Sequence, residues 1–439
     1  MTRAIASGRR AFDDGRWSRL APAGRKKVLH KLADLIEHEA LALTVLGVRD
    51  NGTEINMAFK AEAGSAAGTF RYYAEAIDKV YGEIAATGDD ILALIHREPV
   101  GVVGAIVPWN FPLMIGSWKI APALAAGNSV VLKPAETASL SLLRLAELAA
   151  EAGLPPGVFN VVTGKGSVVG ETLALSMDVD VLAFTGSGAT GRRLLEYSAR
   201  SNMKRCYLEL GGKSPNVVFA DAPDFARAAK VSAAGIFRNS GQVCVAGSRL
   251  LVEHSIHDDF VAEMAKHAEA LKVGDPLDLA SDIGAVNSLG QLQSDLDFVT
   301  RAEAEGANRV TGGRRIRQET GGYYMQPTIM TGVKATDSLF RDEVFGPVLA
   351  VTAFQTEAEA VVLANGTDFG LASAVWTADL GRAHRMVRNI RAGVVHVNTY
   401  GGADATVPLG GVRQSGNGAD KSLHALDKYV DLKTAWIQF

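Results

Sequence analysis

The sequence predicts an α/β protein built from two domains with parallel sheets and one smaller β element. At 439 residues the chain is long for a single domain, since about 150 residues per domain is typical. Short β-branched runs bounded by Gly, Pro or Asn alternate with helical stretches, as in right-handed βαβ units. The content of 47% hydrophobic and 21% charged residues is that of a globular protein with a large core.

The N-terminal part of the sequence predicts helices. Residues 25–40, RKKVLHKLADLIEHEA, place five apolar side chains on one helical face: Val28, Leu29, Leu32, Leu35 and Ile36. The preceding segment MTRAIASGRRAFDDGRW lacks an apolar stretch, and Asp13 and Asp14 argue against an organelle presequence. We therefore expect this segment to form the first helix.

Two series of strands are expected. The first series consists of GVVGAIVP at 101, NSVVLKP at 128, VFNVVTG at 158, DVLAFTG at 180 and RCYLELGG at 205. The second series begins near residue 212 and consists of PNVVFAD, SRLLVE, PVLAVTAF, LASAVWTA and AGVVHVN. Because helical stretches separate the members of each series, each series predicts its own mainly parallel sheet.

Composition and charge exclude several function classes. The 45 basic and 48 acidic residues are spread along the chain, so nothing indicates a nucleic acid or an anionic membrane as partner. No apolar run approaches the roughly 18 residues that span a bilayer. Two cysteines cannot form a disulfide framework, and the Cys and His spacings match no zinc site. We expect a cytoplasmic protein without a metal that acts on a small molecule.

A glycine-rich loop suggests a dinucleotide site. FTGSGATGRRLLEYSAR follows an expected strand, opens a helix and carries Gly186, Gly188 and Gly191 in G-x-G-x-x-G spacing. Such a loop lets the backbone approach a pyrophosphate at the helix N-terminus, and Glu209, 18 residues after Gly191, could then hold the ribose. A tight strand-to-helix turn without a ligand is the alternative.

Seven motifs in order resemble those of the aldehyde dehydrogenase family. They are VPWNFP at 107, KPAE at 133, FTGS at 184, LELGGKSP at 208, GQVCVAGSR at 241, EVFGPV at 343 and PLGGVRQSG at 408. The tail SGNGADKSLHALDKYVDLKTAWIQF further resembles the bacterial branch that acts on γ-glutamyl-γ-aminobutyraldehyde, 4-guanidinobutyraldehyde and related ω-amino or guanidino aldehydes. The resemblance implies an oxidoreductase that converts an aldehyde to its acid with NAD.

The resemblance implies three catalytic residues, and the chemistry needs each of them. Cys244 is the implied nucleophile, because a thiolate that adds to an aldehyde prepares the carbon for oxidation. Asn110 is the implied side-chain donor to the negatively charged oxygen of that adduct. Glu209 is the implied base that activates water to hydrolyse the thioester. The alternatives are an inert buried thiol for Cys244, a turn role for Asn110, and an ion pair or ribose contact for Glu209.

The resemblance also implies the cofactor site. Lys133 and Glu136 would hold the adenosine ribose, whereas Gly186 and Ser187 would contact the pyrophosphate. Glu136 favours NAD over NADP, because its carboxylate would repel a 2′-phosphate.

At the other end of the cofactor, Glu343 would hold the nicotinamide ribose with Phe345 beside it. Trp109 is assigned to the cofactor site as well. Together with Phe111 and Trp118, it is also a candidate for the wall of an aldehyde tunnel, with a place in the core as the alternative.

The implied domain layout has three parts. A Rossmann-like NAD-binding domain would comprise residues 1–80 and 104–211, and an α/β catalytic domain would comprise residues 212–420. A small β element of residues 81–103 and 421–439 would mediate oligomerisation, giving a homodimer or homotetramer.

The sequence departs from the family pattern at several places. Family members usually carry a further segment before the first helix, and we expect its absence to affect stability and assembly. Gly188 stands where threonine is usual, which loosens the backbone. Leu409 replaces a common phenylalanine and Ala403 an aromatic residue, which implies a roomier substrate pocket.

Three further interpretations stay open. Asp404 could pair with the cationic end of an amino or guanidino aldehyde, or it could be a solvated turn residue. The thioester could pass to coenzyme A instead of water, or the chain could be a truncated homologue with a binding role. Cys206 is expected in the core, without a function.

Overall fold

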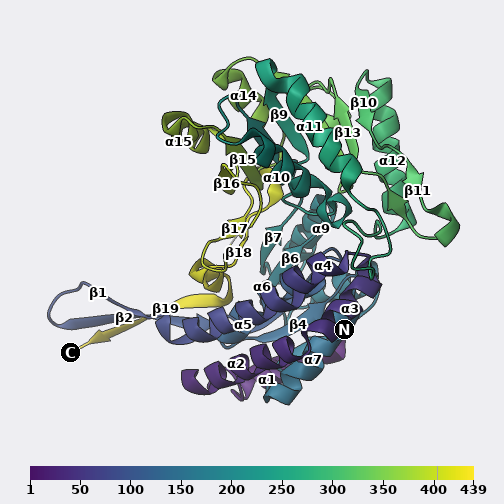
Figure 1. Ribbon diagram of the computed structural model, residues 1–439. Helices are drawn as coiled ribbons and strands as arrows, with labels where there is room; N and C mark the ends of the chain where they lie inside the picture. The colour runs from purple at the N-terminus through teal and green to yellow at the C-terminus, as the bar shows by residue number, and fades with distance from the viewer. Residues whose placement is uncertain (403) are drawn as a thin grey trace.

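The computed structural model describes residues 1–402 and 404–439. Two parallel-sheet bodies pack against each other, and a narrow antiparallel sheet projects from them and carries the C-terminus (Figure 1). The predicted fold class, two α/β bodies with a small β element, is therefore confirmed.

The first sheet has the order β5-β4-β3-β6-β7, and all its pairs are parallel. Its strands are β3 (Val102–Ile106), β4 (Ser129–Lys133), β5 (Phe159–Val161), β6 (Val181–Thr185) and β7 (Arg205–Glu209). All five lie in the runs that predicted them. The chain order reverses between β3 and β6, and ligands of doubly wound sheets bind outside the carboxyl ends of the strands at such a point.

Helices cover both faces of this sheet. They are α1 (Thr2–Asp13), α2 (Pro22–His38), α3 (Ala40–Asn51), α4 (Ile55–Ala58), α5 (Gly64–Ala76), α6 (Pro112–Ala125), α7 (Leu140–Ala152), α8 (Glu171–Leu175) and α9 (Gly188–Ala199). The predicted first helices are confirmed. In α2, Leu29, Leu32 and Ile36 are fully buried and the helix packs against α5, because its apolar residues recur at helical spacing.

The second sheet has the order β10-β13-β14-β9-β8-β15-β16. Its strands are β8 (Pro215–Val218), β9 (Arg249–Glu253), β10 (Asn308–Thr311), β13 (Thr328–Thr331), β14 (Val348–Phe354), β15 (Ala372–Trp376) and β16 (Val394–Val397). Five of them were predicted. The short strands β10 and β13 were not, and β10 is the only antiparallel member among the described strands of this sheet.

The helices of the second body lie on both sides of its sheet. They are α10 (Phe225–Phe237), α11 (His257–Ala270), α12 (Leu289–Ala304), α13 (Ser338–Arg341), α14 (Glu357–Ala364) and α15 (Leu380–Asn389). Two small hairpins complete the described strands: β11 (Arg315–Ile316) with β12 (Tyr324–Met325), and β17 (Leu409–Gly410) with β18 (Ala419–Asp420).

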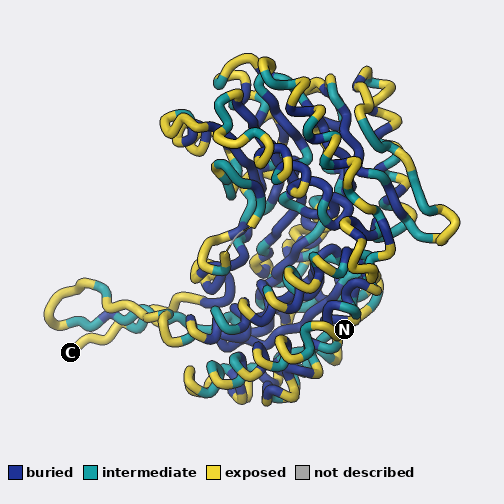
Figure 2. The backbone as a smooth tube through the Cα atoms, in the orientation of Figure 1, coloured by how far each residue is buried: buried dark blue, intermediate teal, exposed yellow. Residues whose placement is uncertain are grey.

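The projecting sheet joins distant parts of the chain. It consists of β1 (Glu83–Ala85), β2 (Ile91–Pro99) and β19 (Val430–Gln438), with β19 antiparallel to β2 along its whole length. Its residues are mostly exposed or half-buried, in contrast to the buried strands of the two bodies (Figure 2). β3 begins at Val102, only three residues after β2 ends, so the arm leads directly into the first sheet. The domain boundaries themselves stay a prediction.

Residues 1–402 and 404–439 contain neither a membrane-spanning helix nor a cluster of metal ligands. No helix among them is both long enough and apolar enough to cross a bilayer. Nor do three or more His, Cys, Asp or Glu side chains in these ranges gather in a way that could hold a metal ion.

Candidate active site

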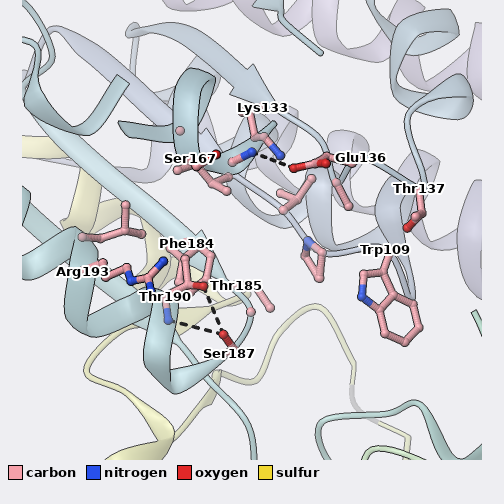
Figure 3. A pocket seen from close by; sticks show the side chains of 18 of the residues that line it. Trp109, Lys133, Glu136, Thr137, Ser167, Phe184, Thr185, Ser187, Thr190 and Arg193 are labelled. Carbon is pink, nitrogen blue, oxygen red and sulfur yellow. Dashed lines mark hydrogen bonds between the residues drawn. The ribbon is translucent and has the colours of Figure 1, made fainter. Parts of the chain in front are cut away.

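Two adjoining cavities form one cleft at the carboxyl ends of the first sheet. The larger, of about 530 Å³, is lined by residues that follow β3, β4 and β6 (Figure 3). The smaller, of about 320 Å³, extends toward the second body and reaches Cys244. Both cavities are lined by Pro108, Trp109, Thr185, Gly186 and Ser187. The cleft therefore runs from the end of β4 to the thiol.

The glycine loop lies at the middle of this cleft. Ser187 is the N-cap of α9, and its Oγ accepts a hydrogen bond from the Thr190 N–H at 3.3 Å. Gly191 packs against β7 so closely that a Cβ there would lie 2.9 Å from the Leu210 side chain. Since a helix N-terminus and its free N–H groups attract anions, the loop fits a pyrophosphate.

Lys133 and Glu136 line the larger cavity and lie near each other (Figure 3). Lys133 is the last residue of β4 and only 5% exposed, and this burial lowers the pKa of its ammonium group. Glu136 is exposed, and its Oε1 accepts a hydrogen bond from the Gly166 N–H at 2.7 Å. A cation and a carboxylate thus face one cavity, which suits the hydroxyl groups of a ribose.

Glu343 and Phe345 line the smaller cavity. The Glu343 Oε1 accepts a hydrogen bond from the Gly212 N–H at 2.9 Å, and burial raises the pKa of its carboxyl to about 7. The rings of Trp109 and Phe345 meet edge to face, with centroids 5.4 Å apart. The residues predicted at the nicotinamide end therefore lie around the same cavity as Cys244. They are Trp109, Glu343 and Phe345, and the four residues come from three distant segments.

Cys244 follows a strained turn at the end of α10. Asn239 and Ser240 have φ angles of 49° and 51°, and at Gly241, with φ of 72°, a Cβ would lie 2.1 Å from the Gly346 carbonyl oxygen. Only glycine fits there. The turn ends this helix and brings the partly exposed Cys244 to the smaller cavity, so the thiol can be reached.

The surroundings of Cys244 keep the thiol protonated in the cofactor-free protein. Burial raises its pKa to about 12, and the nearby carboxyl groups of Glu209 and Glu343 add to this effect. The N–H of Val245 and the charge of Arg238 act in the opposite direction. A thiolate at neutral pH therefore needs a further positive charge in the cleft.

Asn110 is fixed beside the thiol. It is 2% exposed, lines the smaller cavity, and its Nδ2 donates a hydrogen bond to the Gln242 carbonyl oxygen at 2.8 Å. Its backbone carbonyl accepts hydrogen bonds from the side chains of Asn51 and Asn239, both at 3.3 Å. The Asn110 Oδ1 is buried without a hydrogen-bond partner among the described residues, so this amide keeps hydrogen-bonding capacity for a ligand.

Glu209 is the last residue of β7, and its charge acts on Cys244. It is 6% exposed, its Oε1 has no partner among the described residues, and it lines neither cavity. Burial and the charge of Asp420 raise its pKa well above the usual value, and Lys119 and Lys428 oppose this rise. Because it lies outside the cavity of Lys133, the geometry gives no support to a ribose contact.

A buried ion triplet next to Glu209 was not predicted. The Asp420 carboxylate contacts the Lys119 Nζ at 2.8 Å and the Lys428 Nζ at 2.6 Å, and none of the three is more than 5% exposed. One signal was available: Lys119 is the only charged residue of the apolar helix PLMIGSWKIAPALA.

The structure also places the second cysteine, two aromatic residues and Asp404, for which the sequence left roles open. Cys206 is buried in the core, as predicted. Phe111 and Trp118 are buried too, and Lys421 lies over the Trp118 ring, 4.9 Å from its centroid. The Asp404 Oδ1 accepts a hydrogen bond from the Thr406 N–H at 2.9 Å, which is the geometry of a turn aspartate.

Leu409 and Ala403 are the two residues that were expected to widen the substrate pocket. Leu409 is 9% exposed, at the edge of the core. Ala403 lies outside the described residues, so its effect on the pocket stays a prediction.

Fold and site define an α/β protein in which a nucleotide-sized cleft ends at an accessible cysteine. The chain belongs to the aldehyde dehydrogenase family, whose profile matches residues 1–435. The resemblance inferred from the seven motifs is thereby confirmed.

Three relatives show how close this membership is. The NADP/NAD-dependent aldehyde dehydrogenase PuuC of Escherichia coli K12 is 52% identical over 435 residues, which are 99% of this chain and 87% of PuuC. A crystal structure of an indole-3-acetaldehyde dehydrogenase with NAD⁺ is 51% identical with a TM-score of 0.99, covering 100% of this chain and 88% of that one. The structure of γ-glutamyl-γ-aminobutyraldehyde dehydrogenase from Burkholderia cenocepacia J2315 is 49% identical with a TM-score of 0.97, covering 99% and 88%.

Proposed function

We propose that this protein oxidises an aldehyde to its carboxylic acid with NAD, through a thiohemiacetal and a thioester on Cys244. One observation carries the proposal: Cys244, Asn110 and Glu343 line a single cavity that continues into a cleft with a glycine loop. Family membership supports the same reaction, since the relatives named above are aldehyde dehydrogenases.

The cleft fits NAD along its length. Lys133 and Glu136 would hold the adenosine ribose, and Gly186 with Ser187 at the N-terminus of α9 would bind the pyrophosphate. Glu136 disfavours the 2′-phosphate of NADP, although PuuC is described as using both cofactors. When bound, NAD supplies the oxidant that accepts the hydrogen of the aldehyde carbon together with its electron pair.

The nicotinamide end of the cleft is shaped by aromatic and acidic residues. Glu343 would accept hydrogen bonds from the ribose hydroxyl groups there. Trp109 and Phe345, held edge to face, would confine the nicotinamide ring within the cavity that reaches Cys244.

Cys244 forms the bond to the substrate. Its sulfur attacks the carbonyl carbon, and the carbonyl oxygen takes on negative charge. The Asn110 Nδ2 and the Cys244 backbone N–H donate hydrogen bonds to that oxygen. The Asn110 side chain is fixed before the substrate arrives by its bond to the Gln242 carbonyl oxygen. Loss of the carbon-bound hydrogen then leaves a thioester on the cysteine.

Glu209 completes the reaction as the base for hydrolysis. It takes a proton from water, and the resulting hydroxide attacks the thioester, which releases the acid and restores Cys244. Burial with a raised pKa keeps the Glu209 carboxyl basic enough for this step, whereas a fully exposed glutamate would be a weak base.

The substrate class proposed here is an aldehyde with a nitrogen-containing polar group. The B. cenocepacia relative is named for γ-glutamyl-γ-aminobutyraldehyde, and the tail of this chain resembles the same branch. Asp404 would pair with a cationic end of such a substrate, but its turn geometry and exposure favour a structural role.

One experiment separates the proposal from its two alternatives. The protein is incubated with NAD and butanal, with and without coenzyme A, and the products are identified by mass spectrometry. The proposal predicts butanoate and NADH in both mixtures. Butanoyl-coenzyme A as the main product would identify an acyl-transferring enzyme. NAD binding in calorimetry without any product would identify a homologue that only binds.

We also propose that the projecting sheet joins copies of this chain into a homodimer or homotetramer. The exposed apolar residues Ile84, Leu432 and Trp436 lie on its strands β1 and β19. Light scattering after size exclusion should give a multiple of 46.3 kDa, and a single 46.3 kDa species would contradict the proposal.

A further inference from the structure

The short segment NGTE, residues 51–54, contacts both halves of the candidate active site. It joins the end of α3 to the start of α4, on the side of the first body that faces the second (Figure 1). Gly52 ends α3 with a φ of 79°, and its carbonyl oxygen accepts a hydrogen bond from the Ala285 N–H at 3.0 Å. The three polar residues of the segment are no more than 4% exposed. Polar side chains at such depth are expected to have specific partners.

Asn51 holds the loop that carries the proposed oxyanion donor. Its Nδ2 donates hydrogen bonds to the backbone carbonyl oxygens of Trp109 at 3.1 Å and Asn110 at 3.3 Å. Its Oδ1 accepts a hydrogen bond from the Thr53 N–H at 3.0 Å. Both ends of the Asn51 amide are therefore used, and they bind the segment to two residues that line the smaller cavity.

Thr53 and Glu54 hold the turn that precedes Cys244. The Thr53 Oγ1 donates a hydrogen bond to the Asn239 Oδ1 at 2.8 Å, and the Asn239 N–H donates to the Glu54 Oε1 at 3.1 Å. Asn239 has a φ of 49°, a conformation that asparagine adopts more readily than most residues. The segment therefore fixes both the backbone and the side chain of the first strained residue in this turn.

The Asn239 side chain carries this constraint to the oxyanion donor. Its Nδ2 donates to the carbonyl oxygens of Asn110 at 3.3 Å and Gln242 at 3.4 Å. The Gln242 carbonyl oxygen also accepts the hydrogen bond from the Asn110 Nδ2. Reversal of the Asn239 amide would point its oxygen at two carbonyl oxygens, which repel it. The amide oxygen must therefore face Thr53, where it needs a hydrogen-bond donor.

The Thr53 hydroxyl supplies that donor. Among residues 1–402 and 404–439, no other group donates a hydrogen bond to the Asn239 Oδ1. Loss of the hydroxyl would leave this oxygen buried without a partner, and an unsatisfied buried acceptor is unfavourable. The Asn239 amide would then turn or shift, and the two carbonyl oxygens that it holds would be released.

We propose that Thr53 is a positioning residue for the oxyanion donor, acting through the Asn239 amide on the Asn110 backbone and on the Gln242 carbonyl oxygen. This role rests on the aldehyde oxidation proposed above. Thr53 lines neither cavity of the cleft, so it is not placed to contact the aldehyde or NAD. Its hydroxyl therefore affects the rate of the chemical step and leaves the affinity for NAD unchanged.

The first test compares the wild type with Thr53→Val and Thr53→Ser. Stopped-flow absorbance measures the rate constant of NADH formation from butanal in the first turnover, and calorimetry measures NAD binding. Thr53→Val keeps the shape of the side chain without the hydroxyl, and its rate constant should fall about 10-fold, as for one lost hydrogen bond in a buried network. Thr53→Ser keeps the hydroxyl and should retain most of the rate. NAD affinity should be equal in all three proteins.

Thr44→Val is the matched control. Thr44 lies in α3 and is fully buried, but its Oγ1 donates to the Ala40 carbonyl oxygen within the same helix at 2.7 Å. This variant loses a buried hydroxyl without any contact to the turn, so its rate constant should equal that of the wild type. An equal loss of rate in Thr44→Val and Thr53→Val would overturn the proposal, and so would a Thr53→Ser variant as slow as Thr53→Val.

A double-mutant cycle tests whether Thr53 acts through Asn110. In the Asn110→Ala background the side chain that Thr53 positions is gone, so Thr53→Val should cause no further loss of rate. The same 10-fold loss in both backgrounds, expected at about that size for an independent role, would overturn the proposal. Thermal unfolding establishes that each variant is folded, and Thr53→Ala replaces Thr53→Val if the latter does not fold. If the wild type forms no NADH, the proposed function fails, whereas an active wild type with an unchanged rate in Thr53→Val overturns only the role of Thr53.

Discussion

The Asn110 Nδ2 donates a hydrogen bond to the Gln242 carbonyl oxygen at 2.8 Å, and Gln242 precedes Cys244 by two residues. This bond joins the loop after β3 in the first body to the turn after α10 in the second. The proposed oxyanion donor and the proposed nucleophile are therefore fixed relative to each other, although 134 positions separate them in sequence.

Removal of the Asn110 side chain should slow the chemical step. We expect Asn110→Ala to lower kcat about 100- to 1,000-fold with little change in NAD affinity, since a preorganised donor to the oxyanion is lost. Steady-state kinetics and calorimetry measure the two quantities. Asn128→Ala is the control, because Asn128 is equally buried but donates only to the carbonyl oxygens of Ala123 and Tyr429. An equal loss of kcat in both variants would mean that Asn110 is merely structural.

Glu209→Gln should trap the acyl-enzyme. Without a base for hydrolysis, the thioester on Cys244 accumulates, and intact-protein mass spectrometry detects the added acyl group. Glu62→Gln is the control, since Glu62 is also buried with a pKa raised to about 8 but binds the Met114 N–H. Normal turnover of Glu209→Gln with weakened NAD binding would instead favour the ribose role.

Alkylation of Cys244 should increase steeply with pH in the absence of cofactor. Because the thiol pKa is raised to about 12, the thiolate fraction should grow about tenfold per pH unit between pH 7 and 10. Iodoacetamide labelling in a Cys206→Ala background measures this rate at Cys244 alone. Glu209→Gln should accelerate labelling at a given pH, because Glu209 contributes to the raised pKa. A plateau near pH 7 would show that the protein itself stabilises the thiolate.

Asp295 should make the folded state less stable as pH rises. It is fully buried in α12, and burial raises its pKa from 3.8 to about 8. The folded protein therefore binds this proton more tightly than the unfolded chain. The associated stability is complete below about pH 4 and is lost as pH rises to about 8.

Asp295→Asn should consequently gain stability relative to the wild type between pH 5 and 8, as measured by thermal unfolding. Asp297→Asn is a matched control, because Asp297 is exposed on the same helix. Both aspartates accept a hydrogen bond from the glutamine four positions earlier, Gln291 at 2.7 Å and Gln293 at 2.8 Å. The same pH dependence in both variants would contradict the account.

Breaking the buried ion triplet should be strongly destabilising. Asp420→Asn leaves the ammonium groups of Lys119 and Lys428 buried without a counter-charge, for which a loss of about 3–5 kcal/mol is typical. Glu357→Gln, in the exposed pair with Arg385, should cost at most about 1 kcal/mol. Denaturant unfolding compares the two, and a similar small loss would mean that the triplet is not desolvated.

Much of the fold was predictable because its signals are local. Strands such as β3 and β6 are buried on both faces of a parallel sheet, so their sequences are continuous apolar runs bounded by turn residues. β10 and β13 have only four residues each, and β10 is mainly exposed and polar, so no local pattern distinguishes them from loops.

The candidate site was predictable where motifs carry it. The structure brings Asn110, Cys244 and Glu343 to one cavity, but their roles stay predictions. The charges of the site were not predictable, because they depend on burial and on neighbours from other segments. The raised pKa of Cys244, for example, has no signature in the residues beside it in the sequence.

The central claim is that Cys244 forms a covalent bond to the aldehyde during its oxidation. The most direct test measures NADH formation from butanal by absorbance for the wild type and for Cys244→Ala. Calorimetry first establishes that the two proteins bind NAD equally well. The account predicts steady NADH formation by the wild type and none by the variant. NADH formation that persists without the thiol would contradict covalent catalysis by Cys244.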